Sequence, residues 1–587
     1  MTHMTSSATK SITIVTKTDP LTPVEGSLAL LLEHAGDASL PFPHDHLPGL
    51  AELLGPSAET KLRAWQLTQK LIAGEPVFEG VLQLHVMEEI IIRALENIFH
   101  AIHLDRWLRN NGLSECRFRA PSPHIERLRS IQSASGSTYS IVAPATDKPS
   151  IAQKVKRRVA NKGASGLSDS LVLGARKFFP NAARYLAAVP KARRSKQRGG
   201  WWFYSTAYTF TNIGLAYEPH LPQPFQYLID SSETGDAPLR ERGRGYFDIY
   251  AWVGASDLPG KNALDELRQR LLQWMNAVQL DGDDAVARTA LLQSDVFRTY
   301  LRRILPLTCF HSRIFGKFLD EVSPELIVGG NAAFEGPLLQ LARTRGIPTV
   351  LLQHGILGDY YQLMDQPADT LVVRGEFWKE FVSERMRSRT RIINVPSEKA
   401  PAHATHKHDG KILFLTSVDA ALTHTHESDL RDILARLLRV GGKSHRALVV
   451  RVHPMEQIGY YRNIIEELRA EHNLHAEIEY SQGQGLDTIL ANTAVAVTYS
   501  STVFLDCLRR GIPIVSFDWH DFAYKSLIER HGVFHFAEDL ADLERLIGEG
   551  LAGRLAAKSD YERFLAPTAQ QDVSGFFQSL VQKSAKV

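Results

Sequence analysis

Short apolar runs alternate with amphipathic stretches from about Phe310 to the end of the chain. The apolar runs include ELIVGG, TVLLQ and DTLVV before residue 395, and KILFL, ALVVRV, AVAVTY and IPIVSF after residue 410. Between them lie segments with apolar positions at helical spacing, such as ESDLRDILARLLRV. Strands that alternate with helices of this kind predict βαβ units and therefore parallel sheets.

A stretch rich in Pro, Ala, His and Lys, SEKAPAHATHKHDG, interrupts this alternation and is typical of a linker. We therefore predict an α/β fold with two doubly wound, Rossmann-like domains that face a cleft. The N-terminal domain is expected over residues 1–395, the linker over 396–410 and the C-terminal domain over 411–555.

The first half of the chain has a different pattern. Apolar residues recur at i, i+3 and i+4 from about Glu59 to Asn110, which predicts core-packed helices inserted at about residues 50–130 of the N-terminal domain. SITIVT and TYSIVAPAT are expected to form strands on either side of this insert.

Charge and cysteine content narrow the class of protein. The 587 residues contain 67 Lys and Arg against 65 Asp and Glu, and this net charge of +2 excludes a strongly basic nucleic-acid binder. Three scattered cysteines without a CxxC pair argue against a disulfide framework or a Cys-rich zinc site. With no signal-peptide pattern and no long apolar run, we expect a cytoplasmic enzyme.

One segment departs from the overall charge balance. Residues 154–198 hold thirteen Lys and Arg against one acid, and the aromatic run WWFY follows at residues 201–204. One interpretation is a surface for anionic lipid or a phosphorylated acceptor, which would place the enzyme peripherally on the inner face of the cytoplasmic membrane. The other is a solvated helix face followed by a buried strand. No nucleic-acid-binding motif accompanies the charge.

Polar residues directly after the apolar runs are the candidate site residues, because ligands bind beyond the carboxyl ends of parallel strands. In the C-terminal half, Ser500, Ser501 and Thr502 follow AVAVTY and open a helix-like stretch. Three hydroxyls there fit the oxygens of a phosphate, and simple helix capping is the alternative. Ser417, after KILFL, repeats the pattern.

The segment RVHP supplies the second group of candidates. Pro454 ends the strand, so His453 is expected at the sheet edge, where an imidazole can donate to a phosphate or protonate it as it leaves. Arg451 lies two residues earlier and adds positive charge.

The N-terminal domain offers a carboxylate. Glu335 and Gly336 follow LIVGGNAAF, and Glu335 is predicted to be a general base; a helix-N-terminal Glu stabilised by the helix dipole is the alternative. His354 and Gly355, after TVLLQ, are expected to line the same cleft.

Together these groups favour transfer from a nucleotide-activated donor to an acceptor hydroxyl. No DxD-like pair follows a strand of the donor half, so no cofactor or obligatory metal is expected. A His-rich tract lies in the linker-like region, and we interpret it as adventitious; its members are His403, His406, His408, His424 and His426.

The motifs RVHP and TYSSTVFLDCLRRGIPIV resemble the HP and SS/ST motifs of bacterial GT-B glycosyltransferases that use CMP-activated sugars, namely sialyltransferases and Kdo transferases. PTVLLQHG and DTLVVRGEFW look like the capsule-type Kdo transferases. The resemblance covers about residues 325–536. It implies that His453, Ser500 and Ser501 hold the CMP phosphate, and that Glu335 in FEGP is the base, although the second acidic residue of many sialyltransferases is replaced by Phe334 or absent.

The resemblance implies metal-independent, inverting transfer of a 2-keto-3-deoxy sugar acid (Kdo, sialic acid or another nonulosonate) from its CMP form. The acceptor would be a hydroxyl of a glycan, a glycolipid or a protein, in capsule or lipopolysaccharide assembly. GT-B enzymes often send a C-terminal helix back to the first domain, and residues 556–587 are expected to do so.

Two alternatives remain open at this stage. A CDP-glycerol-type glycerophosphotransferase shares the architecture and has a histidine near an HG motif, here His354 and Gly355. A non-catalytic binding protein with a nucleotide-sugar fold would also fit. The UDP-sugar 2-epimerase class is disfavoured, because its chains are usually much shorter.

Overall fold

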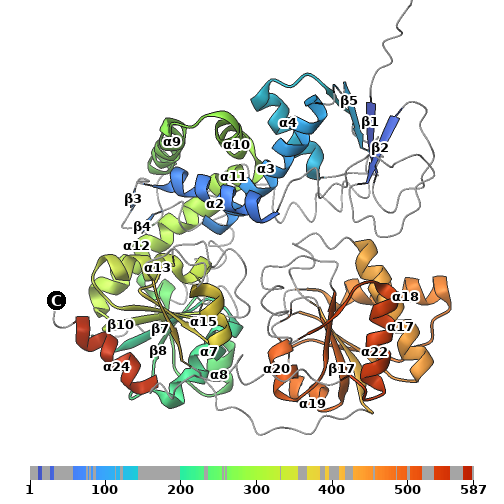
Figure 1. The fold of residues 1–587 in the computed structure, drawn as a ribbon. Coiled ribbons are helices and arrows are strands. Elements are labelled where there is room, and N and C mark those ends of the chain that lie inside the picture. Colours follow the sequence, from blue (N-terminus) through green and yellow to red (C-terminus); the bar gives the residue numbers. More distant parts are fainter. Residues whose placement is uncertain are drawn as a thin grey trace, which may run out of the picture. The chain divides into compact units, whose positions relative to one another are not determined.

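The fold is taken from a computed structural model (Figure 1). The described residues are 11–15, 27–31, 57–73, 77–78, 81–82, 88–110, 112, 114–118, 123–142, 198–230, 236–253, 257, 261–330, 332–353, 366–383, 390–395, 409–416, 427–453, 456–483, 485–498, 501, 503–517, 534–555 and 573–584. By compactness the chain divides into two units, residues 1–208, 226–327 and 332–347, and residues 209–225, 328–331 and 348–587. The predicted boundaries of the two domains and the linker stay predictions.

The C-terminal sheet has six parallel strands in the order β16-β15-β14-β17-β18-β19. In chain order the strands are β14 (Lys411–Leu415), β15 (Leu448–Arg451), β16 (Ile478–Ser481), β17 (Thr493–Thr498), β18 (Ile514–Phe517) and β19 (His535–Ala537). The helices between and after them are α17 (Glu427–Ser444), α18 (Ile458–His472), α19 (Leu486–Ala491), α20 (Phe504–Arg509) and α22 (Leu540–Leu551). The predicted parallel α/β architecture of this half is confirmed.

Burial explains why these runs form strands. β17 and β18 are buried along their whole length, which suits β-branched and other apolar residues covered on both faces. Apolar residues of α17, α18 and α22 pack with the strands into one core. Gly550 of α22 lies so close to β17 that an added Cβ would come within 2.9 Å of Val495. A glycine there lets the helix approach the sheet.

A seven-stranded sheet has the order β13-β12-β11-β10-β7-β8-β9. Its strands are β7 (Trp201–Ser205), β8 (Gln226–Ile229), β9 (Phe247–Asp248), β10 (Leu326–Gly329), β11 (Thr349–Leu352), β12 (Thr370–Val373) and β13 (Arg391–Asn394). The pairs β7–β8, β8–β9, β11–β12 and β12–β13 are parallel. The predicted strands ELIVGG, TVLLQ and DTLVV therefore belong to a second parallel sheet.

The aromatic run WWFY forms β7, a central strand of this sheet. Trp201, Trp202, Phe203 and Tyr204 are each at most 4% exposed. The ring of Trp202 packs against that of Phe318 at 5.0 Å. These aromatics therefore belong to the core, and the membrane interpretation keeps only the charges of residues 154–198, of which all but Arg198 lie outside the described residues.

The seven-stranded sheet is accompanied by helices from distant parts of the chain. They are α7 (Tyr208–Tyr217), α8 (Ala237–Glu241), α11 (Asp295–Thr299), α12 (Leu305–Val322), α13 (Ala332–Thr344) and α15 (Glu376–Ser383), together with the 3₁₀-helices η2 (Glu218–His220) and η3 (Ile249–Trp252) and the π-helix η5 (Tyr300–Ile304). Helix α12 packs on α13 and on η3, and these contacts fix the side chains of the site described below.

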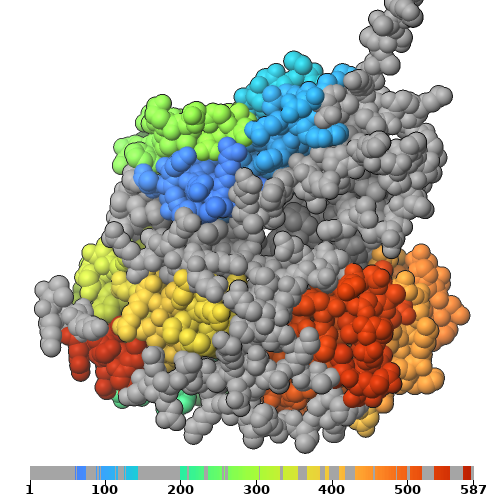
Figure 2. Space-filling view, in the orientation of Figure 1, coloured from blue at the N-terminus to red at the C-terminus, as the bar shows by residue number. Residues whose placement is uncertain are grey.

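A helical cluster is built from two separate segments. α2 (Ser57–Ile72), α3 (Glu88–Asn110) and α4 (Pro123–Ser135) come from the predicted insert, and they pack with α10 (Gly282–Gln293), which follows α9 (Lys261–Ala277). In Figure 2 the surfaces of the two segments, blue and green, adjoin. Arg63 of α2 forms ion pairs with Asp283 and Asp284 of α10 at 3.0 and 3.1 Å. The insert is therefore completed by residues that lie 220 positions from Arg63 in the chain.

The strands before residue 150 form a sheet of their own, a feature that the sequence pattern did not predict. β1 (Ser11–Val15), β2 (Ser27–Leu31), β5 (Glu115–Phe118) and β6 (Ser140–Val142) pair in parallel in the order β2-β1-β5-β6. A separate two-stranded pair is formed by β3 (Val77–Phe78) and β4 (Val81–Leu82). The predicted N-terminal segment, 1–395, thus contributes two larger sheets.

The last described element is α24 (Val573–Ser584). Its Phe577 is fully buried, and the Phe577 ring lies 6.2 Å from that of Phe225, the residue directly before β8. The predicted return of residues 556–587 to the N-terminal domain stays a prediction. Among the described residues no helix is both long enough and apolar enough to span a bilayer.

Candidate functional site

The strand order of the C-terminal sheet creates a switch point between β14 and β17. From β14 the chain builds β15 and β16 on one side, and then β17, β18 and β19 on the other. At such a point the connections leave in opposite directions, so the carboxyl ends of the two strands border a crevice. Thr416 directly follows β14, and Thr498 ends β17. Of the predicted phosphate-binding residues, Arg451, His453 and Ser501 are described, and they end or follow β15 and β17.

The turn at His453 is held by a chain of hydrogen bonds. The His453 backbone N–H donates to Thr416 Oγ1 at 2.8 Å, and the Thr416 hydroxyl donates to the carboxylate of Glu456. The Tyr461 hydroxyl, from α18, donates to the other oxygen of Glu456 at 2.8 Å. Both oxygens of Glu456 are therefore occupied in fixing this turn.

A residue directly after β16 also binds this turn. Gln482 Nε2 donates to the backbone carbonyls of His453 and Glu456, both at 2.9 Å. The backbone of His453 is thus bound on its N–H and on its carbonyl side, while its side chain stays partly exposed. Such a fixed backbone restricts the directions in which the imidazole points.

Arg451 binds two groups at the end of β16. Its guanidinium donates to Ser481 Oγ at 2.6 Å and to the carbonyl of Gly483. Partial burial lowers the pKa of Arg451 from its ordinary value. Arg451 therefore joins the ends of β15 and β16, next to the His453 turn, and its predicted role toward phosphate stays a prediction.

Ser501 lies in the turn that follows β17. It is 8% exposed; its N–H donates to Thr498 Oγ1 at 3.1 Å, and its carbonyl accepts from Phe504 N–H at 3.0 Å. The turn is therefore anchored at both ends, on the strand and on α20. The remaining predicted residues of this group lie outside the described residues; they are Ser417, Pro454, Ser500 and Thr502.

The seven-stranded sheet has its own switch point, between β7 and β10. From β7 the chain adds β8 and β9 on one side and β10 to β13 on the other. Glu335, in the first turn of α13, bridges the strand ends here, because it accepts a hydrogen bond from Thr206 N–H after β7 at 3.1 Å. Glu335 is 0% exposed, and the neighbouring Gly336 is also buried. His354 and Gly355 lie outside the described residues.

A second carboxylate stands at this edge and was not among the sequence candidates. Asp230 directly follows β8, and its backbone N–H donates to the carbonyl of Ser205 at 3.0 Å. The Tyr250 hydroxyl donates to Asp230 Oδ2 at 3.1 Å, and His311 Nε2 lies 3.4 Å from the same hydroxyl. The strand-end rule would have found Asp230, because it follows the apolar run QYLI.

The surroundings of these acids are buried enough to shift the pKa values of neighbouring side chains. Burial raises the pKa of Tyr204 well above its ordinary value, and the nearby charges of Asp230 and Glu335 act in the same direction. Desolvation lowers the pKa of His311, against the opposing charge of Asp230. These shifts favour neutral Tyr204 and neutral His311 near pH 7.

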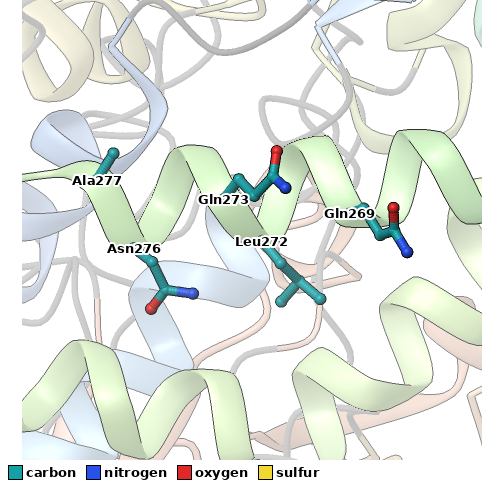
Figure 3. Close-up of a pocket in the computed structure, with 5 residues that line it drawn as sticks. All are labelled: Gln269, Leu272, Gln273, Asn276 and Ala277. Atoms are coloured by element: carbon teal, nitrogen blue, oxygen red, sulfur yellow. The ribbon is translucent and has the colours of Figure 1, made fainter.

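Two further kinds of site are a metal centre and a surface depression. Within the described part of the chain, no group of three or more His, Cys, Asp or Glu is arranged to hold a metal ion. A depression of about 680 Å³ lies along α9, and Figure 3 shows the residues that line it, Gln269, Leu272, Gln273, Asn276 and Ala277. All five come from one helix and none is titratable, so this depression supplies no catalytic group.

A comparison with protein-family models finds no match, and neither does a comparison with curated proteins. Among solved structures, the chain is similar to a glycosyltransferase from Rickettsia africae, with 8% identity over 66% of this chain and 99% of that one, at a TM-score of 0.39. It is also similar to a putative UDP-N-acetylglucosamine 2-epimerase from Listeria monocytogenes, with 11% identity, 66% and 97% coverage and a TM-score of 0.41.

A third similar structure is the UDP-GlcNAc 2-epimerase from Neisseria meningitidis bound to UDP-GlcNAc. Its identity is 11%, it covers 65% of this chain and 100% of its own, and its TM-score is 0.40. TM-scores this low carry no argument about activity. The function is therefore argued from the residues of this chain.

Proposed function

We propose that this protein is a glycosyltransferase of GT-B type that moves a sugar from a nucleotide-activated donor to an acceptor hydroxyl. The observation that carries the proposal is the kind of side chain found at the switch point of each sheet. One places the fixed His453 turn and the Thr498–Ser501 turn at the same sheet edge. The other carries the carboxylates Glu335 and Asp230. Hydroxyls and an imidazole suit a leaving phosphate, whereas carboxylates suit a proton acceptor.

The donor is proposed to be the CMP form of a 2-keto-3-deoxy sugar acid, such as Kdo, sialic acid or another nonulosonate. The HP and SS/ST motifs of the sequence support this choice. The acceptor is proposed to be a hydroxyl of a surface glycan, a glycolipid or a protein. The proposal needs no metal, because His453 and the hydroxyls at the end of β17 would stabilise the charge on the phosphate.

In the proposed reaction the acceptor hydroxyl attacks the anomeric carbon as its proton passes to a carboxylate. The bond from the anomeric carbon to the phosphate oxygen breaks, and the nucleotide leaves with the electron pair. His453 donates a hydrogen bond to that phosphate. Attack opposite the leaving group inverts the anomeric carbon in one step.

Nucleotide stabilisation tests the donor site. A ligand at a hundred times its dissociation constant adds about 2.7 kcal/mol of stability. We expect CMP to raise Tm, UDP and ADP to have little effect, and His453→Ala to abolish the CMP effect. His472→Ala is the control, because its partly exposed ring lies at the end of the helix after the turn. Stabilisation by UDP without CMP would reject the CMP-sugar donor, and stabilisation by CDP alone would favour glycerophosphate transfer.

The basic segment gives a separate proposal about location. We propose that residues 154–198 hold the enzyme on the anionic inner face of the cytoplasmic membrane through their thirteen cations. Neutralising KVKRR and KARRSKQR is expected to weaken binding to vesicles that contain phosphatidylserine. If vesicle binding persists when either basic segment is neutralised, and does not respond to salt, the result would count against this location.

A further inference from the structure

Three residues from three elements form a hydrogen-bonded chain beside the N-terminal switch point. His311 comes from α12, Tyr250 from η3, and Asp230 from the end of β8. The Tyr250 hydroxyl lies 3.1 Å from Asp230 Oδ2 and 3.4 Å from His311 Nε2. The ring of His311 also packs against Phe315 at 5.6 Å. The three hydrogen-bonded residues are therefore packed against aromatic side chains.

The direction of these bonds follows from the proton inventory. An ionised carboxylate only accepts, and a phenol carries a single proton, so Tyr250 donates to Asp230. The Tyr250 oxygen is then left as an acceptor, and His311 donates to it from Nε2. The result is a line of donors that ends on the Asp230 carboxylate and fixes its orientation.

Asp230 differs from Glu335 in the groups that bind it. Asp230 is 5% exposed, whereas Glu335 is 0% exposed and receives a backbone N–H from Thr206. Asp230 Oδ2 is bound by Tyr250, while its backbone is held on Ser205 of β7. Tyr204 lies close enough to Asp230 to be affected by its charge, and the charges of Tyr250, Glu335 and Asp248 act on Tyr204 as well. Both acids are therefore buried, and they differ in their partners: Glu335 accepts a backbone N–H, whereas Asp230 accepts from Tyr250, which in turn lies beside His311.

We propose that Asp230, and not Glu335, is the carboxylate that takes the proton from the acceptor hydroxyl, with Tyr250 and His311 as its positioning residues. This inference rests on the proposed glycosyl transfer. As the acceptor oxygen bonds to the anomeric carbon, its proton moves to the Asp230 carboxylate. The bond between the anomeric carbon and the phosphate oxygen breaks, and CMP leaves with that electron pair. Glu335 then serves to join α13 to the end of β7.

The first experiment compares the two carboxylates in the full chain. CMP-Kdo and CMP-N-acetylneuraminate are offered with water as acceptor, and release of CMP is followed together with the CMP effect on Tm. Asp230→Asn is expected to lower kcat by about 10²- to 10⁴-fold while CMP still stabilises the protein. Glu335→Gln is expected to lower Tm, because Thr206 N–H loses its carboxylate acceptor, and to lower kcat less than Asp230→Asn does. Near-normal kcat in Asp230→Asn would overturn the inference.

The second experiment separates positioning from mere folding. Tyr250→Phe removes a donor to the ionised carboxylate, so the acid limb of the pH profile of kcat/KM is expected to move up by about one pH unit. His311→Leu is expected to move it in the same direction, and His311→Gln, which keeps an N–H donor, to restore it. Tyr204→Phe is the matched control, because the buried Tyr204 hydroxyl has no hydrogen-bond partner among the described residues.

The outcomes separate the inference from the proposed function. An active wild type whose acid limb is the same in Tyr250→Phe and in Tyr204→Phe would overturn the roles of Tyr250 and His311. A wild type that neither binds CMP nor releases it from either donor would overturn the proposed function, and the inference with it.

Discussion

At the scale of single residues, the Thr416 hydroxyl joins two parts of the C-terminal sheet. It accepts from the backbone of His453 and donates to Glu456, so one side chain joins the end of β14 to the turn beyond β15. Removing it would leave a buried N–H and a carboxylate each short of a partner. A loss of this kind typically costs about 1–3 kcal/mol.

We therefore predict that Thr416→Val weakens CMP binding by about tenfold and lowers Tm, because the His453 turn loses its anchor. Thr416→Ser keeps the hydroxyl and is expected to bind CMP like the wild type. Titration of both variants with CMP, followed by calorimetry, checks this. Equal affinity in the valine and serine variants would show that the turn does not depend on this hydroxyl.

The sequence predicts which polar residues lie at strand ends. His453 lies just beyond β15 and Ser501 just beyond β17, because polar residues after buried strands share that edge by topology, and their roles stay predictions. Glu456 and Gln482 were missed, because nothing in their spacing tells that both bind the same turn. Such contacts depend on the packing of β14, β15 and β16 side by side.

At the scale of elements, small residues set how closely helix α22 approaches strand β17. Helix α22 carries two glycines with different surroundings. An added Cβ at Gly550 would lie 2.9 Å from Val495 of β17, whereas at Gly548 it would meet nothing within 4 Å. The same substitution therefore has opposite consequences two residues apart.

Gly550→Ala is predicted to destabilise the C-terminal sheet by about 1–3 kcal/mol through overpacking against β17. Gly548→Ala is predicted to be neutral or to stabilise by up to about 1 kcal/mol, because alanine favours the helix. Thermal unfolding of the two single variants decides the matter. A similar Tm for both would mean that the helix moves away from the sheet without cost.

The aromatic run of β7 shows why the type of an element is easier to predict than its surroundings. WWFY reads equally well as a strand or as an interfacial patch, because Trp and Tyr suit both. Its neighbours in space decide: β8 and β10 flank it, and Phe318 of α12 covers Trp202. These partners lie from about 20 to more than 100 residues away in the chain.

At the scale of the whole molecule, buried titratable groups link stability to pH. Desolvation lowers the folded-state pKa of His311 below its ordinary value of 6.5. The unfolded chain then binds a proton that the folded chain does not, so stability is lost as the pH falls below 6.5. The largest slope for one such group is about 1.4 kcal/mol per pH unit.

We predict that the wild type loses more Tm than His311→Gln when the pH is lowered from 7.5 to 5.5, because the glutamine does not titrate. Differential scanning calorimetry of both proteins at the two pH values measures this. Parallel losses in the two proteins would show that His311 is protonated as easily in the folded chain as in the unfolded one.

The sequence by itself determined the α/β class, most of the strands after residue 310 and the edge of each sheet that carries polar side chains, because these follow from local patterns of burial. Only the tertiary structure decided the separate sheet before residue 150, the burial of WWFY and the joining of Asp230, Tyr250 and His311. The physical reason is the same in each case: those features depend on contacts between residues far apart in the chain, and a linear pattern of apolar and polar positions does not encode which distant segments pair.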